Sequence, residues 1–255
     1  MIDRKSDHLE QVAADFDRLA PLYDQLPSAR SHDELLMSFA PLNRSAKVLE
    51  VGCGTGALLA KLAQKGHVVK GCDISSAMLS RAGLRLGELN GILLNCPAEQ
   101  INERLGEERF DVIIAERVLH HCLEPKEVVL DLYHLLTPGG ILLILDLLST
   151  GPRSIRQRGL HTLARISFLL KASLTGDFRE QLGIIDRERE VMSSEAWRQH
   201  LRHEPSFNLR RLRNELGAKN LSPSYRALSP RFGLVILRRE ELWSSRSEKS
   251  RGRRD

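Results

Sequence analysis

The sequence predicts a doubly wound α/β fold, and three features of its 255 residues support this prediction. Short apolar segments alternate with helical patterns from about residue 47 onward, which is typical of βαβ units that build a parallel sheet. A glycine-rich turn separates the first apolar segment from the first of these helices. Hydrophobic residues make up 42% and charged residues 28%, which is the composition of a globular chain and excludes a fibrous or mostly disordered one.

The first four expected strands and their connecting helices fill residues 47–115. The strands are expected at Lys47–Val51, His67–Cys72, Ile92–Asn95 and Phe110–Ala115, with helices at Thr55–Gln64 and Ser75–Leu86. Ser75 suits a helix start because its hydroxyl can accept a hydrogen bond from a free N–H group of the first turn.

The next helix is expected at Pro125–Leu136, because proline fits a first helical turn and Thr137-Pro138-Gly139-Gly140 ends the pattern. A fifth strand follows at Ile141–Leu147. Later elements are expected as a helix from Ser194, a helix near Phe207–Leu216, and β-rich segments at Ser222–Leu228 and Phe232–Arg239. If these last two pair as a hairpin at the sheet edge, the sheet is seven-stranded, Rossmann-like and mostly parallel, with an antiparallel edge strand.

Three regions are expected along the chain. Residues 1–44 form N-terminal cap helices, residues 45–240 form the main domain with a helical insertion at about 151–200, and residues 241–255 form a flexible basic tail. Within the insertion, Leu160, Leu163, Leu170 and Leu174 recur at helical spacing opposite basic residues. This spacing predicts a basic amphipathic helix over about 151–176.

Charge is distributed unevenly between the two parts of the chain. Residues 1–150 hold 15 Lys and Arg against 21 Asp and Glu, whereas residues 151–255 hold 23 against 12, and 20 of these 23 are Arg. The basic part is compatible with an anionic partner such as nucleic acid, an acidic carrier protein, a lipid headgroup or a carboxylate substrate. The charge by itself does not choose among them.

The first residues, MIDRKSDHLEQ, lack the apolar core of a secretion signal, and the longest apolar run, Ile141–Leu145, is far too short to span a membrane. A cytoplasmic protein is therefore expected. The cysteines, Cys53, Cys72, Cys96 and Cys122, show no metal-ligand spacing, so they are expected to be reduced and to bind no metal.

The glycine-rich turn Glu50-Val51-Gly52-Cys53-Gly54-Thr55-Gly56 indicates a nucleotide site, because glycines let the backbone approach a ligand closely before a helix. Asp73, at the end of the next strand, can accept both hydroxyls of a ribose. A dinucleotide usually requires a third glycine where Ala57 stands. Glu50 favours the alternative, an amino-acid-bearing nucleoside, because its carboxylate can receive an ammonium group.

Four segments, VLEVGCGTGALLAKLA, GCDISSAML, FDVIIAERVLHH and LTPGGILLI, resemble the class I S-adenosylmethionine (SAM) methyltransferase family over roughly residues 45–147. The resemblance implies SAM as cofactor. It places Gly52, Cys53, Gly54 and Gly56 at the methionine end, Asp73 on the ribose, Ile74 and Met78 on the adenine, Ala98 and Glu99 at the adenine edge, and Glu116 beside the cofactor. Many relatives carry Asp where this chain has Pro97, which predicts weaker adenine recognition.

The segment VAADFDRLAPLYDQLPSAR resembles the cap helix of small-molecule and carrier-linked methyltransferases. That resemblance makes Tyr23 a residue that closes over SAM and Arg30 the partner of the methionine carboxylate. A general base is needed only for an acceptor that is protonated at neutral pH. His120 and His121, directly after the fourth strand, are the candidate bases, and Tyr23 is counted with them as a candidate catalytic residue.

The leading hypothesis is a SAM-dependent methyltransferase that acts at oxygen, nitrogen or carbon of a small organic acceptor. The alternatives are a methyltransferase for a modified tRNA base or a carrier-bound acid, and a regulatory protein that binds SAM without turnover. The insertion can face the acceptor, nucleic acid, an acidic carrier protein or a peripheral membrane surface, or it can form a dimer contact, so a monomer and a homodimer both remain open.

Overall fold

The structure is a computed structural model of the 255-residue chain. It describes residues 4–24, 32–39, 45–89, 91–149, 190–203, 205–219, 221–229 and 231–240. Several expectations fall outside these ranges: Arg30, the amphipathic helix over 151–176 and the tail over 241–255.

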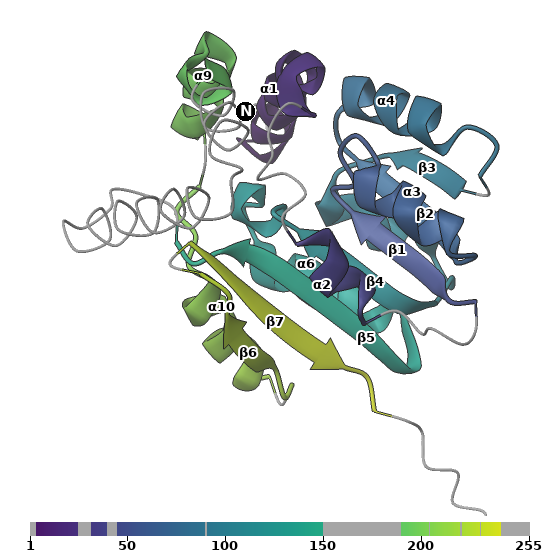
Figure 1. The fold of residues 1–255 in the computed structure, drawn as a ribbon. Coiled ribbons are helices and arrows are strands. Elements are labelled where there is room, and N and C mark those ends of the chain that lie inside the picture. Colours follow the sequence, from purple (N-terminus) through teal and green to yellow (C-terminus); the bar gives the residue numbers. More distant parts are fainter. Residues whose placement is uncertain are drawn as a thin grey trace, which may run out of the picture.

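A seven-stranded sheet forms the centre of the fold, in the order β3-β2-β1-β4-β5-β7-β6 (Figure 1). Its strands are β1 Lys47–Val51, β2 Val68–Asp73, β3 Gly91–Asn95, β4 Phe110–Glu116, β5 Leu136–Leu147, β6 Ser224–Ala227 and β7 Phe232–Arg238. The first five are parallel, whereas β7 pairs antiparallel with both β5 and β6. The predicted mostly parallel sheet and its terminal hairpin are thus confirmed, with β6 as the outer edge.

The described helices are α1 Arg4–Tyr23, α2 Asp33–Met37, α3 Ala57–Gln64, α4 Ser76–Leu86, α5 Ile101–Leu105, α6 Pro125–His134, α9 Glu195–His203 and α10 Leu209–Gly217, with short 3-10 helices η2 Ala98–Gln100 and η3 Leu119–His121. The Ser75 hydroxyl accepts from the Met78 N–H (3.1 Å), as predicted for a helix cap. Some boundaries were wrong: α3 begins at Ala57 instead of Thr55, and α6 ends at His134 because Leu136 already pairs with Phe110 and so begins β5.

Side chains on the two faces of the sheet enter two separate hydrophobic clusters. In β1, Val48 packs on the face covered by α2, α3 and α4, whereas Leu49 and Val51 pack on the face covered by α5, α6 and α10. This alternation follows from the two-residue period of a strand, and burial on both faces explains why these strands are continuous apolar runs.

The strand order reverses between β1 and β4, and ligands of open α/β sheets bind at the carboxyl ends of strands beside such a reversal. Glycines after β1, Asp73 at the end of β2 and Glu116 at the end of β4 therefore meet at one edge. Helices α1 and α9 lie side by side at this end of the sheet (Figure 1). The topology thus places the candidate site beneath α1.

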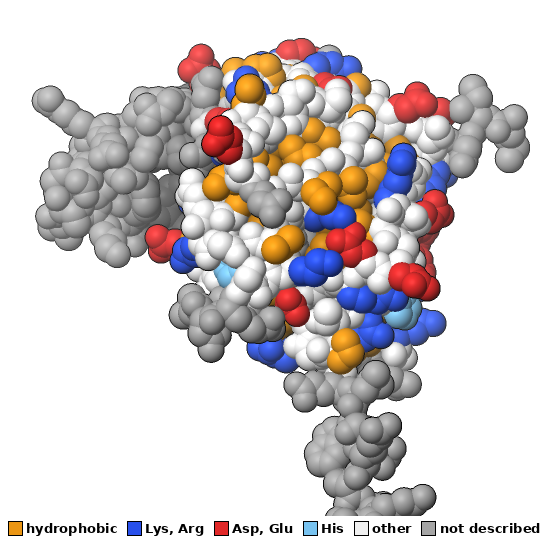
Figure 2. Space-filling view, turned by 90° about the vertical axis from the view of Figure 1, so that its right-hand side faces the viewer, with side chains coloured by type: hydrophobic (Ala, Val, Ile, Leu, Met, Phe, Trp, Pro, Cys, Tyr) orange, Lys and Arg blue, Asp and Glu red, His pale blue; other side chains and the backbone are white. Residues whose placement is uncertain are grey.

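The surface beside β3 and α4 carries both signs of charge around a hydrophobic area (Figure 2). The exposed hydrophobic residues of these neighbouring elements are Val68 on β2, Leu84 on α4 and Ile92 on β3. Among the residues that the structure describes, no helix is both long enough and apolar enough to cross a membrane.

Candidate cofactor and acceptor site

The turn after β1 is built from three glycines in the left-handed region, with φ of 68° at Gly52, 52° at Gly54 and 72° at Gly56. Only glycine adopts this region at little cost. A Cβ atom at Gly52 would lie 2.8 Å from Val118 Cγ2, and one at Gly56 would lie 2.8 Å from the Ala82 Cβ atom. The glycines therefore serve backbone conformation and close packing together.

We expect Gly52→Ala to destabilise the protein by about 2–5 kcal/mol, because the left-handed backbone costs an alanine about 1–2 kcal/mol and overpacking adds about 1–3 kcal/mol. Urea unfolding with and without Val118→Ala measures the two parts. Adding Val118→Ala to Gly52→Ala should restore the stability lost to overpacking, whereas the stability lost to the backbone conformation should remain lost. Equal stability of wild type and Gly52→Ala would contradict the expectation.

Asp73 is buried at the end of β2 and accepts two backbone hydrogen bonds, from the Gly54 N–H (2.8 Å) and the Ser75 N–H (2.9 Å). Burial raises the pKa of this carboxyl to about 6, and the two N–H donors oppose that rise. The contact with Gly54 ties the β2 end to the glycine turn. The contact of Asp73 with a ribose stays a prediction from the sequence.

Two cavities open at the carboxyl edge of the sheet. The larger is a cleft of about 630 Å³, and the smaller encloses about 430 Å³. Of the predicted site residues, the larger cleft is lined by Tyr23, Gly52, Gly54, Asp73, Ile74, Met78, Ala98, Glu99, Glu116 and His121. The smaller is lined by Tyr23, Glu50, Gly52, Cys53, Gly54 and Glu116. Most of the residues predicted from the sequence thus converge on one region.

Two predicted residues lie apart from these linings. Gly56 begins α3 and packs against Ala82, and it borders neither cavity. His120 is also absent from both linings. Their direct contact with a ligand stays a prediction from the sequence, and so does that of Arg30, which lies outside the described residues.

Glu50 is one of the buried acids that line the smaller cavity, together with Asp33. Its Oε2 atom has no hydrogen-bond partner among the residues that the structure describes. Burial raises the pKa of Glu50 well above its usual value, and the neighbouring Glu116, Asp33 and Asp73 raise it further. A ligand cation would remove both penalties, because it would give the carboxylate a partner and offset the surrounding negative charge.

Helix α1 is fastened over the site by acids that the sequence analysis did not single out. Asp17 accepts from the Ser75 hydroxyl (2.6 Å) and from the Ala77 N–H (3.0 Å), which joins α1 to the start of α4. Just after the helix, Asp24 pairs with Arg85 (2.9 Å). Polar residues on an amphipathic helix usually face solvent, so no pattern in the sequence distinguished these.

Tyr23, at the end of α1, borders both cavities. Burial raises the pKa of its phenol, so the group stays protonated at neutral pH and keeps an O–H that a ligand can accept from. This agrees with a closing role over a ligand more readily than with the role of a base.

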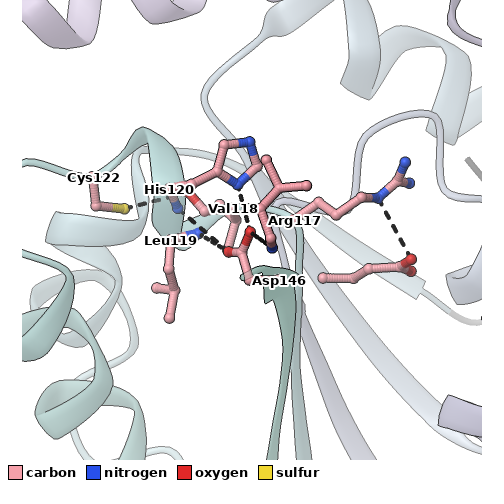
Figure 3. Close-up of polar contacts among 8 residues, drawn as sticks. Arg117, Val118, Leu119, His120, Cys122 and Asp146 are labelled. Carbon is pink, nitrogen blue, oxygen red and sulfur yellow. Dashed lines mark hydrogen bonds and ion pairs between the residues drawn. The ribbon is translucent and has the colours of Figure 1, made fainter. Parts of the chain in front are cut away.

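The two adjacent histidines have different surroundings. The imidazole of His120 donates through Nδ1 to Asp146 Oδ1 (2.6 Å), and the same carboxylate accepts from the Leu119 N–H (2.9 Å) and the His120 N–H (3.3 Å) (Figure 3). Asp146 is fully buried near the end of β5. It therefore fixes both η3 and the His120 ring.

His121 borders the larger cleft. Its ring lies 5.1 Å from Phe16, 3.8 Å from His120 and 4.9 Å from His200, as centroid distances. Burial lowers the pKa of His121 well below its usual value, and the neighbouring His120, His200, His8 and Arg117 lower it further. The imidazole is accordingly neutral at pH 7, with a nitrogen able to accept a proton.

Four residues of this region were missed from the sequence: Asp146, Arg117, Phe16 and His200. Asp146 and Arg117 sit within segments that were recognised, but a buried partner of a histidine is visible only once β4 and β5 are paired. His200 reaches the site from α9, about 80 residues away along the chain. The four cysteines are buried and unbridged, and the described residues contain no grouping of three or more His, Cys, Asp or Glu that could hold a metal.

The residues present fit SAM. Gly52 and Gly54 bring the backbone of the turn into the lining of both cavities, Asp73 offers a carboxylate for ribose hydroxyls, and Glu50 offers an unpartnered buried oxygen for the ammonium group. Ile74 and Met78 supply apolar surface for the adenine within the same cleft.

Comparisons with known proteins agree with this geometry. Residues 49–142 match the family model of a methyltransferase domain. The chain is 31% identical over 149 residues to a malonyl-[acyl-carrier protein] O-methyltransferase of Enterobacter lignolyticus, covering 58% of each chain. It is 32% identical over 115 residues to the tRNA 5-carboxymethoxyuridine methyltransferase of Escherichia coli, covering 43% of this chain and 42% of that one. The chain thus spans about half the length of these curated relatives.

A solved structure with the same fold is the 1,6-didemethyltoxoflavin-N1-methyltransferase of Burkholderia thailandensis, which was determined with bound 1,6-didemethyltoxoflavin and S-adenosylhomocysteine (SAH). The two chains are 16% identical, with a TM-score of 0.59, over 94% of this chain and 92% of that one. Residues 49–142 thus match a methyltransferase domain, and the chain has the fold of the class I SAM-dependent methyltransferases.

Proposed function

We propose that the protein transfers the methyl group of SAM to a small organic acceptor, at an oxygen, nitrogen or carbon atom. The observation that carries this proposal is the lining of the larger cleft beyond the cofactor residues. Apart from Arg117, that part consists of apolar side chains and one neutral imidazole: Leu9, Val12, Phe16, Cys96, Pro97, Val118, Cys122 and His121. Apolar clefts with few polar groups suit small ligands.

When bound, SAM supplies a methyl group on a sulfonium whose leaving group is already activated. The protein has to hold the acceptor atom in line and exclude water, and helix α1 over the cleft supports both tasks. For a hydroxyl or phenol acceptor, His121 takes the proton at a ring nitrogen. The bond between His120 and Asp146 fixes η3, and because His121 belongs to η3 this bond also positions His121.

A second candidate function is methylation of a modified tRNA base or of an acid on a carrier protein. The printed names of two relatives favour it, since one acts on tRNA and the other on malonyl-[acyl-carrier protein]. The basic residues after position 150 would suit such anionic partners. Against it, Arg117 is the single Lys or Arg among the described residues that line the two cavities.

The experiment that separates these functions follows radiolabelled methyl from SAM into a cell extract. Label in the fraction that passes a small-molecule filter supports the proposal. Label that stays behind and disappears after RNase supports the tRNA alternative, and label on protein supports the carrier alternative. Absence of transfer into every fraction, together with SAH binding to the protein, would favour a regulatory role over turnover.

We expect His121→Gln to lower the rate of transfer to a hydroxyl acceptor by about 10²–10⁴-fold, which is the usual contribution of a positioned base. The low pKa of His121 predicts that wild-type rate stays level from pH 8 down through 6.5 and falls only below that, as the imidazole becomes protonated. Single-turnover rates across this pH range are the measurement.

The matched control is His134→Gln, because His134 is exposed at the end of α6 and borders neither cavity. It should leave the rate and its pH profile unchanged. An unaltered rate in His121→Gln would rule out the base and leave the acceptor as a group that needs none, such as a carboxylate.

A further inference from the structure

Arg117 has an unusual backbone conformation for its residue type. Its φ is 54°, and among the described residues it is the one non-glycine position in the left-handed region. Its N–H donates to the Leu145 carbonyl (2.7 Å), so pairing at the end of β4 holds it there. Strained conformations of this kind cost about 1–3 kcal/mol and gather at functional sites, because surrounding structure must maintain them. The strained backbone of Arg117 therefore makes its side chain a candidate functional group.

The Arg117 side chain lies where the two cavities adjoin, because it lines both of them. The described lining also contains six acids: Asp24, Asp33, Glu50, Asp73, Glu99 and Glu116. Against these acids, Arg117 is the single Lys or Arg of the described lining. Arg85 and Lys61 pair with Asp24 and Asp33 from outside the cavities. A ligand anion in either cavity would thus meet one guanidinium.

Arg117 and Glu116 form a long ion pair at the end of β4. Nε of Arg117 lies 3.5 Å from Glu116 Oε1, beyond the usual length of a charge-assisted hydrogen bond (Figure 3). A guanidinium carries five N–H donors in a planar fork and can bind a second carboxylate without releasing the first. The side chain is mostly buried, with 18% exposed, so a carboxylate bound there would be shielded from water.

We propose that Arg117 is the carboxylate-binding residue of this site. The inference rests on the proposed function, and the carboxylate has two possible sources: the methionine end of SAM, which would enter the smaller cavity opposite Glu50, or an acidic acceptor in the larger cleft. In the first case Arg117 takes the role that the sequence resemblance assigned to Arg30. In the second, it makes the acceptor an organic acid.

The test measures binding by calorimetry in wild type and in Arg117→Met. The probes are SAH and 5′-methylthioadenosine, which keeps the adenosine and sulfur but lacks the amino-acid end. If the cofactor supplies the carboxylate, Arg117→Met weakens SAH binding by at least tenfold and leaves methylthioadenosine binding unchanged. Arg117→Lys keeps the positive charge but loses the planar fork of donors. Its SAH affinity should therefore lie between those of wild type and Arg117→Met.

If the acceptor supplies the carboxylate, SAH binding is unchanged and the difference appears in a second titration. SAH-loaded wild type would then bind benzoate or malonate, and SAH-loaded Arg117→Met would bind both at least tenfold more weakly. No change in either titration overturns the inference. Failure of wild type to bind SAH at all would instead contradict the assignment of the cofactor, so the two failures are distinguishable.

Arg109→Met is the matched control, because Arg109 borders neither cavity and bonds through its guanidinium to the Gly106 and Glu108 carbonyls. It should reproduce wild-type binding in both titrations. Thermal unfolding of each variant establishes that it is folded. A variant that loses methylthioadenosine binding together with SAH binding has damaged the whole cleft, which would count against a role confined to the carboxylate.

Discussion

Asp146→Ala is expected to destabilise the protein by about 3–5 kcal/mol, which is the cost of removing one partner of a buried charged network. The Asp146 carboxylate is completely buried and accepts from the N–H groups of Leu119, His120 and Leu147 and from the His120 ring. Without it, these donors lose their partner in the protein interior. The measurement is the free energy of unfolding in urea.

Asp146→Ala should also disturb the larger cleft, because His121 belongs to η3 and lines that cleft. Asp131→Ala provides the comparison: Asp131, on α6, accepts one side-chain hydrogen bond, from Asn102 at 3.3 Å, and should cost less than about 1 kcal/mol. If the two variants proved equally stable, the network around Asp146 would not be the feature that secures the segment after β4.

Asp73→Ala is expected to weaken SAH binding by about 100-fold or more, because hydrogen bonds to a charged group contribute about 1.5–3 kcal/mol each and a ribose presents two hydroxyls. Calorimetric titration with SAH and with 5′-methylthioadenosine should show equal losses, since both ligands contain the ribose. This pattern differs from that expected for Arg117→Met. Retention of wild-type affinity in Asp73→Ala would exclude Asp73 as the ribose ligand.

The pH dependence gives a second measurement on the same residue. Burial raises the pKa of Asp73 to about 6, so at pH 5 about one carboxyl in ten is ionised. SAH affinity of wild type should therefore fall by about tenfold between pH 7 and 5. The stability of the cofactor-free protein should change in the opposite direction. The Asp73 contribution is fully present below the unfolded pKa near 4 and is lost as pH rises through 6, by about 3 kcal/mol in total.

Much of the cofactor half of the site is local in sequence, which is why it could be predicted. Gly52 and Gly54 follow a strand directly, and Asp73 ends the next one, so a parallel pairing of β1 with β2 suffices to bring them together. The hydrophobic alternation that identified these strands also fixed which face each side chain occupies. The cysteines were expected to be unbridged and are so in the structure, where each is buried.

The proposed acceptor side of the larger cleft is assembled from distant parts of the chain. Phe16 on α1, His121 after β4 and His200 on α9 meet through helix packing, which depends on shape and burial rather than on a spacing that can be read along the chain. The bond between His120 and Asp146 could not be predicted for the same reason. In the sequence Asp146 is an acid near the end of an apolar strand, and only the pairing of β5 with β4 brings it to His120.

The sequence by itself determined the doubly wound sheet and the glycine turn, since both depend on strand period, backbone freedom or a short spacing, whereas SAM as cofactor followed from the family resemblance. Only the tertiary structure decided that His120 is engaged by Asp146 while His121 borders the cleft, that Glu50 is buried with a raised pKa, and that Arg117 lies between both cavities. These are properties of burial and of charges brought together by folding. Such properties set pKa values and ligand contacts, but they follow no periodic pattern in the amino-acid sequence from which they could be predicted.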